Sequence, residues 1–441
     1  MTVLDGSPYQ GYLYAYPHKT AYRRLEPRPP LREVWQAEPR DRLFLYVHVP
    51  FCEMRCGFCN LFTRARPPAE QVSDYLRQLR VQAEQVAAAI GPARYARAAF
   101  GGGTPTYLTA AELDELYAVT RDVMGLRPGE AGLSVETSPA TATDDRLAVL
   151  AAHGTHRVSM GVQSFLDAEA HAAGRPQNRV EVDRALDALR AARFPVLNLD
   201  LIYGIPGQTS RTWEYSLETA LQWRPEEIFL YPLYVRPLTG LGRRGDPDAP
   251  DDDWDRQRLE LYRQGRDRLL AAGYRQLSMR QFRRRELPDP DGPDYSCQDD
   301  GMVGLGCGAR SYTRQLHYSF DYAVSVREVR GIIDDYVRRP AGDFAYAEVG
   351  FALDGAEQRL RWLVKSLLRA DGADADAYQA QFGTELATDH PHLTAIEARG
   401  WVGWDGPILK LTPEGLGRSD LIGPWLISDT VRAAMAQAVL R

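Results

Sequence analysis

Three cysteines on one short loop are the residues of this chain with the most specific chemistry. Cys52, Cys56 and Cys59 follow the apolar run Leu43 to Val49 with the spacing CxxxCxxC. Three thiolates at this spacing can ligate three irons of a [4Fe-4S] cube, and no nearby fourth cysteine completes the set. The fourth iron is then open to a substrate or a cofactor, as one position is open in catalytic zinc sites.

Two other interpretations of this loop stay open from the spacing alone. His48 could complete a zinc site with the three thiols, or the cysteines could be small core residues. The remaining cysteines, Cys297 and Cys307, are expected to be packed thiols, because a buried free cysteine behaves as a small apolar residue. A reactive or ligating role for either is the less favoured alternative.

Composition narrows the class of protein. The chain has 441 residues, a net charge of -6 and five cysteines. The length predicts about two to three domains, and the modest acidity disfavours nucleic acid as the main partner. An odd, clustered set of cysteines forms no disulfide framework, and neither a signal peptide nor an apolar run of about 20 residues is visible. We therefore expect a cytoplasmic protein with no membrane partner.

The chain from Arg42 to about Arg236 alternates short β-type runs with longer amphipathic runs. This alternation predicts about six β/α units around a parallel sheet. The predicted strands are Leu43–Val49, Arg97–Phe100, Gly132–Glu136, Arg157–Gly161, Val196–Ile202 and Glu227–Leu233. The clearest predicted helices are Ser73–Ala89, Ala111–Met124, Arg179–Ala192, Thr212–Gln222 and Trp254–Ala272. Thr109 and Thr143 are the predicted N-caps.

Each predicted strand ends in a polar or glycine-rich sequence. The five that come after the cysteine loop are Gly101–Thr106, Glu136–Pro139, Gly161–Phe165, Asp200–Gln208 and Tyr231–Pro237. In a barrel of parallel strands these ends converge on one rim, where the active sites of such barrels are built. The six sequences together therefore predict a single site.

Several side chains of this rim carry groups that bind amino-acid-like ligands. Glu136 and Asp200 can accept hydrogen bonds from an ammonium group or from ribose hydroxyls, and Arg175 can hold a carboxylate through two bonds. Gln163 can donate and accept, and the glycines 101–103 let a ligand approach the backbone closely. Each alone has an ordinary explanation, such as a tight turn or a solvated charge. Their common placement favours ligand binding.

These motifs together resemble a known family. The cysteine loop, GGGTPT, ETSP, GVQSF and DLIYGIPGQ are similar to motifs of the radical S-adenosylmethionine superfamily, over about Leu43 to Tyr312. Within it, the chain resembles the branch of oxygen-independent coproporphyrinogen III oxidase, its haem-chaperone paralogue and the class C radical methyltransferases. The fold we expect is α/β, a partial (β/α)6 TIM-like barrel with a C-terminal winged-helix-like α+β domain.

The resemblance also implies cofactors and the residues that hold them. Cys52, Cys56 and Cys59 would ligate a [4Fe-4S] cluster, and S-adenosylmethionine would bind its open iron. A second S-adenosylmethionine is an open expectation. Tyr46 and Glu136 are the expected catalytic residues. The implied cofactor-binding residues are Tyr46, Phe58, Gly102, Gly103, Thr104, Glu136, Gln163, Arg175, Asp200, Ile202 and Tyr234.

The implied activity is reductive cleavage of S-adenosylmethionine to a 5'-deoxyadenosyl radical, which removes a hydrogen atom from a small-molecule substrate. A reductant such as flavodoxin would supply the electron. The chain would oxidise or C-methylate a substrate that the sequence does not identify. The alternatives are an oxygen-independent coproporphyrinogen III oxidase of haem biosynthesis and a haem carrier without radical turnover.

Two regions depart from the patterns of this branch. The oxidase has a further cysteine two residues after the third ligand, where this chain has Leu61. The chaperone has an HNxxYW motif before a glycine-rich turn, which survives here as Gly304–Ala309. The positions of the motif are held instead by Gly292, Pro293, Ser296 and Cys297. Both departures favour a relative with a different task.

Three parts of the chain are expected: a tyrosine-rich N-terminal strap (1–40), the catalytic barrel with an extension (41–345) and a C-terminal cap (350–441). The strap either folds over the barrel mouth, with His18 as a candidate proton carrier, or packs on the outside of the barrel. The cap shows helices followed by a hairpin, as in winged helices that bind DNA. Its segment Asp376–Thr388 has acids and no base, so we expect a lid or docking module.

Overall fold

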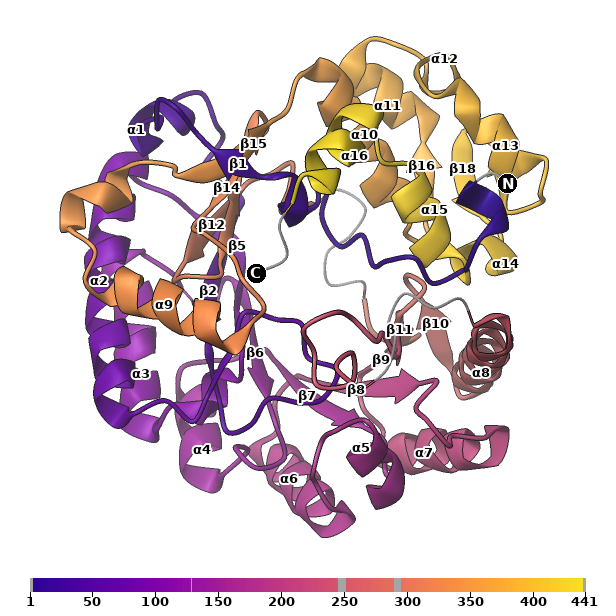
Figure 1. Cartoon of the computed structure of the whole chain (residues 1–441), viewed down its shortest axis with the longest axis horizontal. Helices are drawn as coiled ribbons and strands as arrows, with labels where there is room; N and C mark the ends of the chain where they lie inside the picture. Colours follow the sequence, from indigo (N-terminus) through magenta and orange to yellow (C-terminus); the bar gives the residue numbers. More distant parts are fainter. Residues whose placement is uncertain (1–2, 128, 245–250, 289–294, 439–441) are drawn as a thin grey trace.

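A single large sheet organises the molecule in this computed structural model, which describes residues 3–127, 129–244, 251–288 and 295–438. The sheet has 13 strands in the order β1-β15-β14-β13-β12-β2-β5-β6-β7-β8-β9-β11-β10. Its two end strands do not pair with each other among the described residues, so the sheet curves into a partial barrel without closing. Figure 1 shows helices along the outside of this curved sheet.

The middle of the sheet consists of the six predicted strands, and all neighbouring pairs among them are parallel. They are β2 (Leu43–Val49), β5 (Tyr95–Gly102), β6 (Gly132–Thr137), β7 (Arg157–Gln163), β8 (Val196–Tyr203) and β9 (Glu227–Pro232). The helices between and after them are α2 (Ala69–Ile90), α3 (Ala110–Ala118), α4 (Asp144–Ala152), α5 (Asp167–Ala172), α6 (Arg179–Ala192), α7 (Ser210–Gln222) and α8 (Asp252–Ala271). The predicted α/β fold is therefore confirmed.

Two local predictions need correction. The helix predicted to reach Met124 keeps α-helical geometry only to Ala118, and a π-helical turn covers Val119–Val123. Thr143 stands at the N-cap position of α4, but its hydroxyl donates to the carboxylate of Asp145 at 2.6 Å instead of capping a backbone amide. Thr109 forms the complete capping box that the sequence predicts for α3.

The two faces of the six central strands differ in chemistry. Side chains that point toward the helices are apolar and fully buried, as Leu45, Val47 and Leu133 illustrate. Alternate residues point to the concave inner face, and these include Tyr46 and Glu136. The packed core therefore lies between the sheet and the helices, whereas the inner face keeps polar groups for ligands.

Antiparallel strands extend the sheet at both edges, and none of them was predicted. On one side lie β11 (Gln281–Arg284) and β10 (Tyr274–Gln276). On the other side β12 (Met302–Leu305) pairs in parallel with β2 and is followed by antiparallel neighbours. These are β13 (Arg310–Tyr312), β14 (Leu316–Ser319), β15 (Val349–Ala352) and β1 (Arg23–Arg24), and α9 (Val326–Val337) connects β14 to β15.

The C-terminal residues form a smaller unit with its own apolar core. Its helices are α10 (Gly355–Leu367), α11 (Ala375–Phe382), α12 (Leu386–Asp389), α13 (Thr394–Glu397), α14 (Pro413–Leu416), α15 (Ser419–Trp425) and α16 (Asp429–Ala436). Its three-stranded sheet has the order β16-β18-β17, from Ala373–Asp374, Ile408–Leu411 and Val402–Asp405. Helices followed by this hairpin give the expected winged-helix-like arrangement.

The N-terminal segment crosses from this unit to the barrel. Leu4, Leu13 and Tyr16 belong to the C-terminal apolar core, and Figure 1 shows the first described residues against that unit. Further along, α1 (Leu31–Val34) packs on the barrel core. The division into three parts stays a proposal, which these two separate cores support. Within the described residues, no helix has the length and apolarity needed to cross a membrane.

Candidate active site

Backbone contacts hold the cysteine loop in place at its ends and at its middle. The short strand β3 (Phe51–Cys52) pairs with β4 (Arg64–Ala65), which fixes the start and end of the loop. At the middle of the loop, the Gly57 amide donates to the carbonyl of Gly174 at 3.0 Å. A Cβ at Gly57 would lie 2.9 Å from the Ala173 carbonyl oxygen, so only glycine fits this close approach.

Each thiol of the loop has a polar neighbour, on another segment for Cys52 and Cys56 and within the loop for Cys59. The Cys52 Sγ lies 3.5 Å from the Thr104 hydroxyl, and the Cys56 Sγ accepts from the guanidinium of Arg175 at 3.5 Å. The Cys59 Sγ lies 3.9 Å from the Thr63 hydroxyl. Burial raises the pKa of both Cys52 and Cys56, so these thiols stay protonated until a metal replaces the protons.

The arrangement of these thiols argues against a single zinc ion. Among the described residues, no three His, Cys, Asp or Glu side chains lie close enough together to hold one metal ion. A [4Fe-4S] cube takes one thiolate per iron, so its ligands stand farther apart than those of one ion. His48 does not complete a zinc site, because its Nε2–H donates to the Phe62 carbonyl at 2.9 Å.

Tyr46 and His48 form a hydrogen-bonded pair beside the loop. Burial lowers the pKa of His48 to about 4, so the ring is neutral and Nδ1 can only accept. The Tyr46 hydroxyl accordingly donates to His48 Nδ1 at 3.3 Å. Tyr46 is thereby held on the inner face of β2, and its expected role beside the cluster stays a prediction.

Glu136 and Asp200 form what we call the acidic wall of the inner face. Burial, followed by the charge of Asp200, raises the pKa of Glu136 to about 7, although the side chain is accessible to solvent. Burial also raises the pKa of Asp200, which accepts from the Asn198 amide at 2.7 Å. Neither carboxylate forms an ion pair within the described ranges of the chain, so both can receive a cationic ligand.

Gln163 sits on strained backbone at the end of β7. Its φ is +67°, in the left-handed region that non-glycine residues rarely adopt, and the pairing with β8 shifts register at this point. Strain of this kind persists at sites where the surrounding structure holds it. The strain could not be read from the sequence, but the residue itself was predicted.

The glycine run has less free backbone than the sequence suggests. The amide of Gly102 donates to Glu136 Oε2 at 3.2 Å, and the amide of Gly103 donates to the Val49 carbonyl at 2.7 Å. Both amide groups are therefore already engaged. Gly102 has a φ of +113°, and a Cβ there would lie 2.5 Å from the ring of His48. Gly102 therefore holds the Glu136 carboxylate through its amide and leaves room for the His48 ring.

The residues expected around an adenine lie in two places. Phe58 packs beside Ile202 in a small apolar cluster that also contains Ile205 and Leu233. Tyr234 instead lies under the C-terminal unit, where its hydroxyl donates to the carboxylate of Asp420. The structure thus brings Phe58 and Ile202 together, whereas Tyr234 also binds the C-terminal unit.

The strap lies over the carboxyl ends of the strands, as the first of its two predicted positions requires. The Arg236 guanidinium, after β9, donates to the Gln10 carbonyl at 3.0 Å, and Arg310, in β13, lies over the Tyr14 ring at 4.7 Å. His18 does not fit the proton-carrier role. Burial and the neighbouring cations lower its pKa to about 3, so its ring is neutral at physiological pH.

Polar side chains at the amino ends of β7 and β9 were missed by the sequence analysis. Glu227 accepts from Arg157 Nε at 2.7 Å and from Arg283 at 2.5 Å, and both partners lower its pKa against the effect of burial. A signal was present, because polar residues alternate along β7, β8 and β9, whereas parallel strands are ordinarily apolar on both faces.

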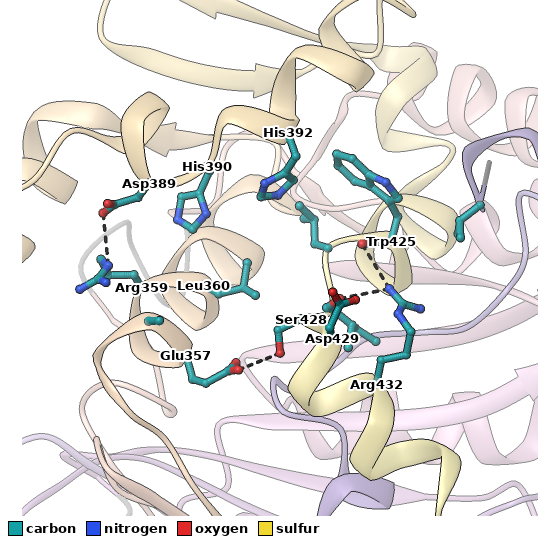
Figure 2. A pocket seen from close by; sticks show the side chains of 14 residues that line it. Glu357, Arg359, Leu360, Asp389, His390, His392, Trp425, Ser428, Asp429 and Arg432 are labelled. Atoms are coloured by element: carbon teal, nitrogen blue, oxygen red, sulfur yellow. Dashed lines mark hydrogen bonds and ion pairs between the residues drawn. The ribbon is translucent and has the colours of Figure 1, made fainter.

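A further hollow lies in the C-terminal unit, away from the cysteines. It has a volume of about 660 Å³, and Figure 2 shows His390, His392 and Trp425 at its wall. Of its three acidic side chains, Glu357 accepts from Ser428 and Asp389 is paired with Arg359.

Comparison with known proteins identifies the family. Residues 46–220 match the family described as "Radical SAM superfamily". The "Oxygen-independent coproporphyrinogen III oxidase" of Escherichia coli is 31% identical over 395 residues, 86% of this chain and 83% of the relative. The chain belongs to the radical SAM superfamily. The "Heme chaperone HemW" of the same organism is 31% identical over 278 residues, 60% of this chain and 69% of the relative.

A solved structure shares the whole fold. The coproporphyrinogen III oxidase HemN of Escherichia coli matches with a TM-score of 0.80 over 95% of this chain and 97% of that chain, at 24% identity. Membership of the radical SAM superfamily implies a [4Fe-4S] cluster and S-adenosylmethionine as cofactors. The residues present fit both groups: three spaced thiols suit the cluster, and two carboxylates without ion pairs, one of them open to solvent, suit a ligand with sulfonium and ammonium charges.

Proposed function

We propose that this radical SAM protein is an enzyme that cleaves S-adenosylmethionine and removes a hydrogen atom from a small-molecule substrate at the inner face of its sheet. One observation carries the proposal. Residues spread along the chain come together: the cysteine loop follows β2, Glu136 and Gln163 lie at the ends of β6 and β7, and Asp200 lies on β8. Arg175, between α5 and α6, contacts Cys56 of the loop.

When bound and reduced, the cluster and S-adenosylmethionine would supply the 5'-deoxyadenosyl radical. The chain's residues would bind and orient. Cys52, Cys56 and Cys59 would hold the iron, and Arg175, which already touches Cys56, would stabilise the thiolate and receive a carboxylate. The reductant is proposed to be flavodoxin or a similar one-electron donor.

The acidic wall would hold the cationic side of S-adenosylmethionine. Glu136 would accept from its ammonium group, and Asp200 from its ribose hydroxyls. Phe58 and Ile202 would pack against the adenine, since they form one apolar cluster beside the loop. Tyr46, fixed by His48, would stand over the reacting atoms as the expected catalytic residue.

Coproporphyrinogen oxidation is the second candidate. It is favoured by the extent of the match, which covers 86% of this chain for the oxidase but 60% for the chaperone. Leu61, where the oxidase has its further cysteine, is 49% exposed and offers no ligand. Of the chaperone's motif, Gly292 and Pro293 lie outside the described residues, and Ser296 and Cys297 replace the tyrosine and tryptophan. Methyl transfer remains a third chemical outcome of the same first step.

Anaerobic turnover tests the proposal. The full chain is reconstituted with iron and sulfide, reduced with dithionite and mixed with S-adenosylmethionine, and 5'-deoxyadenosine is quantified by chromatography. We expect its formation in the wild type and its loss in Cys56→Ala. Equal amounts in both proteins would contradict an enzymatic role. Added coproporphyrinogen, or methyl-labelled S-adenosylmethionine, then separates vinyl formation from methyl transfer.

A further inference from the structure

Lysine is rare in this chain, and one lysine lies at the mouth of the barrel. Of the 53 lysines and arginines, three are lysine: Lys19, Lys365 and Lys410. Lys365 is paired with Asp299 at 3.2 Å, and Lys410 with Asp405 at 2.8 Å. Lys19 forms no ion pair with any residue that the structure describes. Lys19 is therefore the lysine without a carboxylate partner among the described residues.

The surroundings of Lys19 place it next to the cysteine loop. Its ammonium lies 3.3 Å from the centre of the Tyr322 ring, and the Tyr322 hydroxyl donates to the carbonyl of Asn60 at 3.0 Å. Burial, followed by the charge of Arg310, lowers the pKa of Lys19 well below its ordinary value, while Cys59 acts in the opposite direction. A cation in this position is costly unless an anion joins it.

Two arginines share this situation. Arg310 contacts the hydroxyl and the ring of Tyr14, and Arg236 contacts the Gln10 carbonyl and the Tyr234 ring at 4.4 Å. Like Lys19, they have no carboxylate partner in the part of the chain that is described. The charges of all three act on His18, whose pKa they lower. We call His18, Lys19, Arg236 and Arg310 the basic wall.

Carboxylates near the basic wall do not neutralise it. Asp420 is held by Arg280 and by the Tyr234 hydroxyl. Glu136 lies on β6 and Arg310 on β13, and the strand β2, which carries Tyr46, lies between these two strands in the sheet. The pKa of Tyr46 is accordingly raised by the charge of Glu136 and lowered by that of Arg310, against a background of burial, which raises it most. The basic wall and the acidic wall are thus separate regions of the inner face.

We infer that the basic wall is an anion subsite, in which Lys19 and Arg310, with Arg236, bind a carboxylate or phosphate group of the substrate. The inference rests on the proposed function and adds the class of substrate, a small molecule with at least one oxyanion. Because Lys19 belongs to the strap, the anion would also tie the strap to the barrel. The neutral ring of His18 would offer a hydrogen bond without adding charge.

Acylation of lysine tests this subsite directly. The reconstituted full chain is treated with acetic anhydride, with or without inorganic phosphate or propane-1,2,3-tricarboxylate, and mass spectrometry reads each of the three lysines. We expect protection of Lys19 and no protection of Lys410, which is the internal control. Protection by the tricarboxylate alone indicates a carboxylate substrate, and protection by phosphate alone a phosphorylated one. Equal reaction of Lys19 with and without either anion overturns the inference.

A variant of the partner cation sharpens the result. In Arg310→Gln, Lys19 remains as the reporter, and the anion concentration for half-protection should rise by about tenfold or more, the size of a lost charge-assisted hydrogen bond. Arg310→Lys should recover part of the loss. Arg338→Gln, an exposed arginine paired with Asp335, is the matched control. If Arg310→Gln does not melt cooperatively, Arg236→Gln replaces it. Unchanged half-protection in the folded variants would refute the subsite.

The same samples separate this inference from the proposed function. Formation of 5'-deoxyadenosine by the wild type reports the proposed function, whereas protection of Lys19 reports the subsite. Deoxyadenosine without Lys19 protection refutes only the subsite. Lys19 protection without deoxyadenosine refutes only the enzymatic role.

Discussion

The acidic wall and the basic wall of the inner face differ in charge and in the elements that carry them. Glu136 and Asp200 extend from neighbouring parts of a parallel sheet. Burial raises the pKa of each carboxyl group and so favours its neutral form. Lys19 and Arg310 come from the strap and from an antiparallel extension, and burial opposes their charged forms. Neither wall forms an ion pair with the described residues, although the charge of Arg157 lowers the pKa of both acids. We infer that the site receives a cationic ligand on one side and an anionic ligand on the other.

Removal of a cluster ligand should have the largest effect, because S-adenosylmethionine bound at the acidic wall is then not cleaved. Changes around metal ligands alone typically cost about 10- to 100-fold, so Cys56→Ala should lower 5'-deoxyadenosine formation by at least about 100-fold. Iron content and the visible absorption of the reconstituted protein check the cause. Cys307→Ala, which removes a thiol of the apolar core, is the control and should keep its iron. Equal iron in both variants would contradict the assignment of the loop.

Substitution of the acidic wall should come next. Glu136→Gln keeps the size of the side chain but removes the charge, and a hydrogen bond to a charged group is worth about 1.5–3 kcal/mol. We therefore expect S-adenosylmethionine to bind about 10- to 100-fold more weakly, measured by anaerobic equilibrium dialysis. Glu214→Gln, on the outer helix α7, is the matched control. Wild-type affinity in Glu136→Gln would contradict the binding of S-adenosylmethionine at the acidic wall.

The pH dependence of cofactor binding reports the ionisation of Glu136. The pKa of Glu136 is raised to about 7 in the free protein, and a cationic ligand favours its ionised form. Binding should therefore release a proton, and affinity should fall as the pH drops below 7, by up to about tenfold per unit. Equilibrium dialysis between pH 6 and pH 8 measures this slope. A slope that persists in Glu136→Gln would assign the titration to another group.

A change in the framework should have the smallest effect and touch neither wall. Thr109→Ala removes the capping box of α3, where the hydroxyl accepts from the Glu112 amide at 3.3 Å. Loss of such a cap costs about 1 kcal/mol of stability. Thermal denaturation should show a small decrease in Tm, with the affinities for both ligands unchanged. An altered affinity would mean that the walls respond to the outer helices.

Sequence patterns could predict the acidic wall because its residues follow the ends of regular strands. The strand Leu43–Val49 was placed at its observed bounds, since its apolar residues and the loop that follows are strong local signals. Glu136 and Asp200 were predicted from the same regularity. The register of parallel strands then brings their side chains to one end without further information.

The basic wall could not be predicted in the same way. Arg310 lies in a strand of three residues, too short to show a period, and Lys19 begins a single 3-10 turn, Lys19–Ala21. Only tertiary contacts bring them near each other. The positive φ of Gln163 and the polar network of Glu227 also depend on neighbours distant in sequence. Such features follow from packing, which local patterns do not encode.

Calorimetric titration of two ligands into two variants tests the separation of the walls most directly. S-adenosylmethionine and propane-1,2,3-tricarboxylate are each titrated into reconstituted wild type, Glu136→Gln and Arg310→Gln. We predict that Glu136→Gln weakens S-adenosylmethionine by at least about tenfold and leaves the tricarboxylate within about twofold, and that Arg310→Gln does the reverse. If either variant weakens both ligands equally, the two walls are one site and the account is wrong.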